Sequence, residues 1–279
     1  MSDRYQKLLI VEKGRIFIDI AYSGCGSACK YCYVPSSSEK QEVASYSDFE
    51  KIVKILNEYG EKDKYVISFC PNTEPFKSKE SIARVLWVLQ ELHRDRFYFQ
   101  ISTKEYISDS LLEKLNILAK KSTIFINVSI PFLETQRIEP GAATRDQRVS
   151  NIVRIRNYSH LRSGLYIKPC TSNAVDNVER YISIINKVQP DYVCVGVSFD
   201  DKTNIPCASL HREDDAAKII SAQKKLFVSF AEEIKRSAQC PIVYSSICAI
   251  FQESGGVCPL NLWRYDKNLC DSCNVSRDC

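Results

Sequence analysis

The chain has 279 residues, of which 44% are hydrophobic and 26% charged, and this composition is typical of a globular protein and excludes a low-complexity chain. The N-terminal residues lack the pattern of a cleavable signal peptide, and no uninterrupted apolar run is long enough to span a bilayer. We therefore expect a cytoplasmic protein without a membrane segment. The net charge of +4 supports a polyanionic partner only weakly, because mixed surface charges give the same value.

Strands and helices are expected to alternate along most of the chain. Apolar runs predict strands at residues 15–22, 65–69, 97–102, 122–130, 165–169 and 192–199, with a seventh at 242–246. Helical periodicity predicts helices at residues 47–59, 81–93, 110–118, 144–155 and 214–236. A further helix is predicted to begin at Asp176 and Glu179 and to include Val178, Ile182 and Ile185. Three of these helices begin with an expected capping box: Ser47 with Glu50, Ser110 with Glu113, and Thr144 with Gln147.

This alternation implies a parallel sheet with right-handed crossovers. The strands are apolar nearly throughout, as expected when both faces of a sheet are covered. We predict an α/β fold, a partial (β/α)6 barrel of the TIM type, over residues 1–240. Residues 241–279 differ, because Gly255, Gly256 and cysteines replace the regular pattern. They are predicted to form a small Cys-rich appendage.

The chain contains 13 cysteines, and three of them, Cys25, Cys29 and Cys32, lie in one loop after the first predicted strand. In a chain of this length without export signals, many cysteines indicate metal ligation rather than disulfides. Three thiolates can hold a 4Fe-4S cluster and leave one iron open for a ligand that is not protein. Structural zinc needs four ligands, and this loop offers no fourth. A zinc knuckle or three unrelated thiols is the alternative.

With Tyr31 directly before the last cysteine, this loop resembles the signature loop of the radical S-adenosylmethionine (SAM) enzymes. The resemblance implies that SAM chelates the open iron through its amino and carboxylate groups. One electron from the cluster then cleaves SAM to a 5′-deoxyadenosyl radical, which abstracts a hydrogen atom. A one-electron donor such as flavodoxin or ferredoxin is implied as a partner.

Motifs at the ends of the next two predicted strands extend this resemblance. The run that contains Thr73 and Glu74 resembles the Thr-Asp-Pro-Tyr run of enzymes similar to spore photoproduct lyase, where backbone carbonyls meet the SAM amino group. Ser102-Thr103-Lys104 resembles a Thr-Lys run there, which implies that Lys104 pairs with the SAM carboxylate. A lysine suits this task because its long stem delivers a point charge.

After the fourth predicted strand, the resemblance places Asn127 and Ser129 near the ribose of SAM, although both residues could instead be satisfied within the strand. The segment Glu139-Pro140-Gly141, with Arg148 downstream, resembles a Glu-Pro-Gly segment of lyase-like proteins. Because Pro and Gly also simply break a chain, we interpret it as evidence of family rather than as a site.

Cys70 follows the second predicted strand, near the place where spore photoproduct lyase has a cysteine that returns a hydrogen atom to its product radical. The resemblance makes Cys70 a candidate hydrogen-atom donor. The flanking sequence differs, because Pro71 follows directly, and a buried structural cysteine is an equal alternative.

The C-terminal cysteines are spaced for a second metal site. Cys258, Cys270, Cys273 and Cys279 fit either a structural zinc ion or an auxiliary 4Fe-4S cluster, and Cys248 is an alternate ligand. The Cys-x2-Cys-x5-Cys ending is similar to part of the auxiliary-cluster domains of peptide-modifying radical SAM enzymes.

Together these motifs favour a radical SAM enzyme of the spore photoproduct lyase-like group, a lyase or oxidoreductase that acts on DNA or a nucleotide. One alternative is a peptide- or protein-modifying radical SAM enzyme with an auxiliary cluster. The other is a non-catalytic protein that is stabilised by a metal ion and binds nucleic acid as part of a larger assembly. A nucleic-acid substrate predicts salt-sensitive binding, whereas a peptide substrate does not.

Overall fold

A computed structural model describes residues 4–12, 15–29, 32, 38–58, 65–92, 97–131, 135–167, 174–196, 229–230, 232–238 and 241–245. In chain order they form η1 (Arg4–Lys7), β1 (Leu9–Glu12), β2 (Arg15–Ile18), α1 (Tyr46–Glu58), β3 (Tyr65–Phe69), α2 (Lys79–Glu91), β4 (Phe97–Thr103), α3 (Asp109–Ala119), β5 (Ile124–Ser129), α4 (Thr135–Ile138), α5 (Arg145–Ile155), β6 (Leu161–Ile167), α6 (Ala174–Val188), β7 (Tyr192–Gly196) and β8 (Ile242–Ser245).

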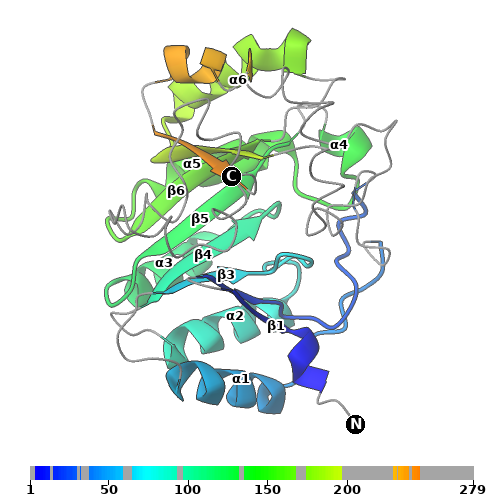
Figure 1. The fold of residues 1–279 in the computed structure, drawn as a ribbon. Helices are drawn as coiled ribbons and strands as arrows, with labels where there is room; N and C mark the ends of the chain where they lie inside the picture. The colour runs from blue at the N-terminus through cyan, green and yellow to red at the C-terminus, as the bar shows by residue number, and fades with distance from the viewer. Residues whose placement is uncertain are drawn as a thin grey trace.

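The eight strands form one sheet in the order of the chain, from β1 to β8. Strand β1 pairs with β2 in antiparallel fashion, and all pairs from β2 to β8 are parallel. Within the described residues β8 pairs only with β7, so the sheet is an open, partial barrel. Figure 1 shows this curved sheet with α1 and α2 beside its first strands and α6 beside its last. The predicted fold class is confirmed.

The two faces of the sheet carry different residues because side chains alternate along a strand. One face packs on the helices and supplies the main core, which includes Ile67, Phe99 and Ile126. The other face lines the inside of the partial barrel. It carries a smaller buried cluster of Val66, Phe125, Tyr192 and Cys194, against which Tyr98 and Tyr166 pack. Polar groups lie on this inner face as well, so it is less apolar than the sequence suggested.

Several boundaries differ from the predictions. Strand β1 was not predicted, and β2 ends at Ile18, before the cysteine loop begins. Helix α1 begins at Tyr46, where the Ser45 hydroxyl accepts a hydrogen bond from the backbone of Asp48, so the predicted box at Ser47 is wrong. Helix α3 has Ser108 as its N-cap, so the predicted capping box of Ser110 with Glu113 is wrong as well.

The capping box of Thr144 with Gln147 at α5 is confirmed. Most of the predicted helix at 214–236 lies outside the described residues, as does residue 246 of the predicted seventh strand, which the structure describes as β8. None of the described helices combines the length and the apolar character needed to cross a bilayer.

Candidate metal and cofactor site

The cysteine loop follows β2 on the side toward which β3 and β4 point (Figure 1). Its turn depends on glycine, because Gly24 and Gly26 have φ angles of +74° and +73°. A Cβ atom on Gly24 would lie well inside 3.0 Å of the Lys40 carbonyl oxygen. The backbone N–H of Cys25 donates to the carbonyl oxygen of Glu39 at 3.2 Å. The segment around Glu39 and Lys40 therefore packs against the cysteine loop and fixes its backbone.

The three predicted thiols share this loop. Cys29 is buried, and Cys25 and Cys32 are partly buried. The backbone N–H of Cys32 donates to the Cys29 carbonyl oxygen at 3.0 Å, which turns the chain between them. Burial raises the pKa of Cys29 to about 11, an effect that the Lys104 charge opposes and the charges of Glu139, Cys32 and Cys25 increase. The thiols of Cys25 and Cys29 both contact Ser27, at 3.5 Å from its hydroxyl and 4.0 Å from its carbonyl oxygen.

Three thiols on one glycine-rich loop fit an iron-sulfur cluster, because thiolates are the protein ligands of such clusters. Within the described part of the chain, no three His, Cys, Asp or Glu side chains are already gathered tightly around a single point. A metal must also displace the thiol protons, since the thiolate is the ligand. The raised pKa values of Cys25 and Cys29 make assembly of the site dependent on that exchange.

The segment that follows α4 packs directly on this loop. The N–H of Gly141 donates to the Ser27 carbonyl oxygen at 3.1 Å, and a Cβ atom on Gly141 would lie well inside 3.0 Å of the Gly26 carbonyl oxygen. Lys77 donates to the Gly141 carbonyl oxygen and pairs with Glu105 at 2.7 Å. The Glu-Pro-Gly segment, which the sequence marks only as evidence of family, thus forms one wall of the cysteine loop.

A buried chain of charges reaches Cys29 from the same segment. Glu139 is fully buried; its Oε2 atom lies 2.5 Å from Nη1 of Arg148, and its Oε1 atom lies 3.9 Å from both Lys104 Nζ and Cys29 Sγ. Arg148 is also fully buried and donates to the Ser129 carbonyl oxygen at 3.0 Å. Its Nη2 atom has no hydrogen-bond partner among the described residues.

The predicted residue Glu74 holds the end of β4 in position. Its carboxylate accepts hydrogen bonds from the Thr103 hydroxyl at 2.5 Å and from the backbone N–H of Lys104 at 2.8 Å. Burial raises the pKa of Glu74 to about 7, although the hydrogen bond from Thr103 opposes this shift. The side chain of Glu74 therefore joins the ends of β3 and β4. The backbone carbonyl oxygen of Glu74 accepts a hydrogen bond from the Gln41 side chain at 2.7 Å.

The Glu74 side chain holds the backbone of Lys104, whose ammonium lies 3.9 Å from Glu139. The Lys104 side chain is 25% exposed. Burial alone would lower the pKa of Lys104, but the charges of Cys29, Glu139 and Glu74 outweigh this effect and raise the pKa above its ordinary value. Lys104 therefore keeps its positive charge at neutral pH.

Asp19, at the end of β2, holds the loop after β3, and sequence reasoning did not select it. Its buried carboxylate accepts from the Asn72 side chain at 2.8 Å and from the Thr73 hydroxyl at 3.0 Å. The Thr73 side chain is thus already hydrogen-bonded within the protein, whereas the sequence analysis predicted SAM contacts from backbone carbonyl groups of this run. Cys70 is buried at the start of this loop, has a φ angle of +58°, and packs within the main core. Burial raises the pKa of the Cys70 thiol well above its usual range, so the thiol keeps its proton.

Asn127 and Ser129 both lie on β5 and are buried. The Tyr192 hydroxyl donates to Oδ1 of Asn127, whose Nδ2 lies 3.4 Å from the Ser102 hydroxyl. A Cβ atom on Gly164, between β5 and β7, would collide with both Tyr192 and Asn127. The Asn127 amide is therefore engaged across the inner face of the sheet.

Some predicted residues lie outside the described part of the chain. These are Tyr31 and the C-terminal cysteines Cys248, Cys258, Cys270, Cys273 and Cys279. The second metal site and the boundary at residue 240 stay predictions.

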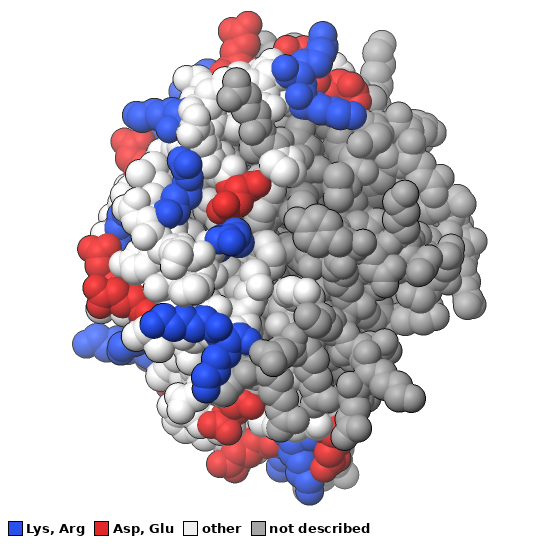
Figure 2. All heavy atoms as spheres, turned by 90° about the vertical axis from the view of Figure 1, so that its left-hand side faces the viewer, with Lys and Arg blue, Asp and Glu red and all other residues white. Residues whose placement is uncertain are grey.

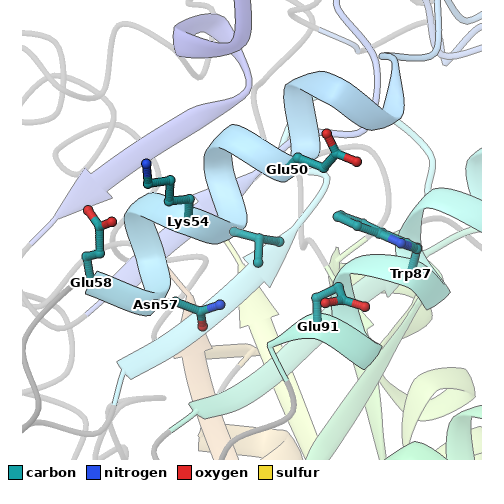
Figure 3. A pocket seen from close by; sticks show the side chains of 7 residues that line it. Glu50, Lys54, Asn57, Glu58, Trp87 and Glu91 are labelled. Atoms are coloured by element: carbon teal, nitrogen blue, oxygen red, sulfur yellow. The ribbon is translucent and has the colours of Figure 1, made fainter.

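A groove of about 530 Å³ lies between α1 and α2 (Figure 3). Its lining includes Trp87, Lys54 and the acidic residues Glu50, Glu58 and Glu91. It contains none of the predicted site residues and lies on the helical exterior of the sheet, away from the cysteine loop. Figure 2 shows Lys and Arg interspersed with Asp and Glu on the described part of one face, without a continuous basic patch there.

Solved structures with this fold support the architecture. SuiB of Streptococcus suis superposes with a TM-score of 0.56 and 14% identity, over 86% of this chain and 51% of that one. Native anSMEcpe with bound AdoMet, which is SAM, superposes with a TM-score of 0.55 and 19% identity, over 81% of this chain and 62% of that one. A double mutant of spore photoproduct lyase, with bound AdoMet and dinucleoside spore photoproduct, superposes with a TM-score of 0.50 and 12% identity. The match covers 77% of this chain and 74% of that one. These identities show a shared fold only.

The chain spans about half the length of SuiB. A search of curated proteins finds no match. The family model of the radical SAM superfamily matches residues 20–198, which is more than half of the chain and includes the cysteine loop and the strand ends described above. The chain therefore belongs to the radical SAM superfamily.

Proposed function

We propose that this protein binds a 4Fe-4S cluster through Cys25, Cys29 and Cys32 and reductively cleaves SAM to a 5′-deoxyadenosyl radical for hydrogen abstraction. The observation that carries the proposal is the position of Lys104 near the cysteine loop, because its ammonium lies 3.9 Å from the same Glu139 oxygen that lies 3.9 Å from the Cys29 sulfur. When bound, the cluster supplies the single electron that cleaves SAM.

The residues around the loop have separate tasks in this proposal. Lys104 binds the SAM carboxylate as a point charge. Glu74 and Thr103 hold the backbone from which Lys104 projects. Backbone groups of the loop after β3, held by Asp19, and the hydroxyl of Ser129 are the proposed contacts for the rest of SAM. Ser129 is the stronger candidate of the two predicted β5 residues, since the Asn127 amide is already engaged.

For the substrate, the proposal is DNA or a nucleotide. It rests on the motif resemblance and on the fold shared with a lyase that has been solved with a dinucleoside photoproduct. In this reading the protonated Cys70 thiol returns a hydrogen atom to the product radical. The flavodoxin or ferredoxin partner is proposed from the need for one electron.

Modification of a peptide or protein is the second candidate. SuiB bound to its precursor peptide SuiA superposes over 98% of this chain, more than spore photoproduct lyase does. The Cys-x2-Cys-x5-Cys ending and the mixed charges of Figure 2 favour the same reading.

The test is anaerobic reconstitution with iron and sulfide, reduction with dithionite and addition of SAM. We expect 5′-deoxyadenosine from the parent protein and none from Cys29→Ala. A protein that holds the cluster but forms no 5′-deoxyadenosine, with or without DNA or peptide, contradicts the proposal and favours a non-catalytic scaffold. Binding to DNA that weakens steeply with salt supports the nucleotide substrate over the peptide.

A further inference from the structure

The carboxylate of Glu139 has a position that the proposed chemistry does not by itself require. It is fully buried, and one of its oxygen atoms lies at the same 3.9 Å from the Cys29 sulfur and from the Lys104 ammonium. Its other oxygen atom is held by Arg148 at 2.5 Å. The Arg148 contact therefore fixes the carboxylate in an orientation in which its other oxygen faces Cys29 and Lys104.

The charged side chains described around this point come from several parts of the chain. Arg148 projects from α5, Lys104 from the end of β4, and Glu139 from the turn after α4. Glu74 faces Lys104 from the loop after β3, and Cys25 shares the loop with Cys29. Because Glu139 and Arg148 are fully buried, solvent screens their charges little.

We propose that Glu139 is a positioning residue that fixes the charge balance beside Cys29 and thereby sets the reduction potential of the cluster. The inference rests on the proposed function, in that Cys29 must be a cluster ligand. Reduction adds one negative charge to the cluster, so a fixed carboxylate nearby opposes reduction and a fixed ammonium favours it. Net charge and solvent exposure are known controls of cluster potential.

The negative charge of Glu139 and the positive charge of Lys104 should have opposite effects on the midpoint potential of the cluster. Glu139→Gln keeps the size and an oxygen acceptor for Arg148 but removes a negative charge, so the midpoint potential shifts to a more positive value. Lys104→Met removes a positive charge from a side chain that is one-quarter exposed, so the potential shifts to a more negative value. A purely structural role would not produce shifts of opposite sign.

The experiment is an anaerobic redox titration of the reconstituted full chain, without SAM, followed by the electron paramagnetic resonance signal of the reduced cluster. The matched control is Glu80→Gln, because Glu80 is 60% exposed on α2 and its charge is screened. Iron and sulfide content and thermal unfolding are measured for each variant. We expect the potential of the Glu80 variant to equal that of the parent.

Two failures are distinguishable. If the parent chain takes up no cluster that depends on Cys29, the proposed function fails. If the parent and Glu139→Gln hold intact clusters with equal potentials, or if Glu139→Gln and Lys104→Met shift in the same direction, the inference about Glu139 is wrong. Should Glu139→Gln not fold, the Lys104 variant alone decides: a negative shift supports the charge balance, and no shift overturns it.

Discussion

The backbone N–H of Gly141 donates a hydrogen bond to the carbonyl oxygen of Ser27, 3.1 Å away and more than a hundred residues earlier in the chain. This contact joins the turn after α4 to the cysteine loop at a separation that leaves no room for a side chain.

Gly141→Ala should therefore damage the cysteine loop. The added methyl group collides with the Gly26 carbonyl oxygen, which is backbone and cannot move aside without distorting the loop. We expect a loss of about 1–3 kcal/mol in the free energy of unfolding and a reduced iron content after reconstitution. Ala142→Ser, at the next residue, serves as the control. Iron content equal to that of the parent in the Gly141 variant would contradict this account.

Lys104→Met should weaken SAM binding more than it weakens the fold. Its ammonium is the proposed partner of the SAM carboxylate, and losing a charge-assisted contact costs about 1.5–3 kcal/mol, or roughly 10- to 100-fold in Kd. Equilibrium binding of SAM to the reconstituted protein measures this change. Lys77→Met is a useful comparison, because Lys77 braces Gly141 and pairs with Glu105 instead. Equal Kd values for the Lys104 variant and the parent would remove Lys104 from the site.

The sequence predicted the parts of this structure that depend on local signals. The strict alternation of strands and helices gives the parallel strand order without any long-range information. The capping box of Thr144 and Gln147 was found because its signal spans only three residues. At α1 the predicted cap was Ser47, whereas Ser45 accepts the hydrogen bond from the first turn; both are serines, so residue type alone does not distinguish them.

The environment of Cys29 could not be predicted in the same way. Glu139 lies 110 residues from Cys29 in the chain, and only the fold brings the two together. The available signal was the Glu-Pro-Gly segment in the connection between β5 and α5, on the side of the sheet where parallel barrels gather their functional groups. Likewise, Tyr192 reaches Asn127 across an intervening strand at Gly164, a relationship that requires the strand register.

The raised pKa of Glu74 predicts a pH dependence of stability. The carboxyl group has a pKa of about 7 in the folded protein, against an ordinary value of 4.5, and burial is the main cause. Between these values the folded state holds a proton that the unfolded state has lost, so stability falls as pH rises from about 4.5 to 7 and then levels off, by up to about 3 kcal/mol. Urea unfolding of the metal-free protein from pH 5 to 8 measures this slope.

Glu74→Gln provides the control for that slope, because a glutamine does not titrate. We expect this variant to lose part of its stability, since one carboxylate oxygen that accepts from Thr103 or Lys104 is replaced by an amide nitrogen. Its stability should nevertheless depend less on pH than that of the parent in this window. Parallel curves for the two proteins would show that another group titrates.

Gly164 and Tyr192 should be coupled through Asn127. Gly164→Ala places a methyl group where the Tyr192 ring and the Asn127 amide oxygen lie, and overpacking of this kind costs about 1–3 kcal/mol. Tyr192→Phe removes the hydrogen bond to buried Asn127 and costs a similar amount, about 1–3 kcal/mol, because the amide oxygen loses its partner. Since both changes disturb the same contact, the double variant should lose less than the sum of the two single losses.

Urea unfolding of all four proteins measures this coupling, with the half-exposed Tyr106→Phe as the control. Strictly additive losses would mean that Gly164 is required for a reason other than the passage of Tyr192 to Asn127.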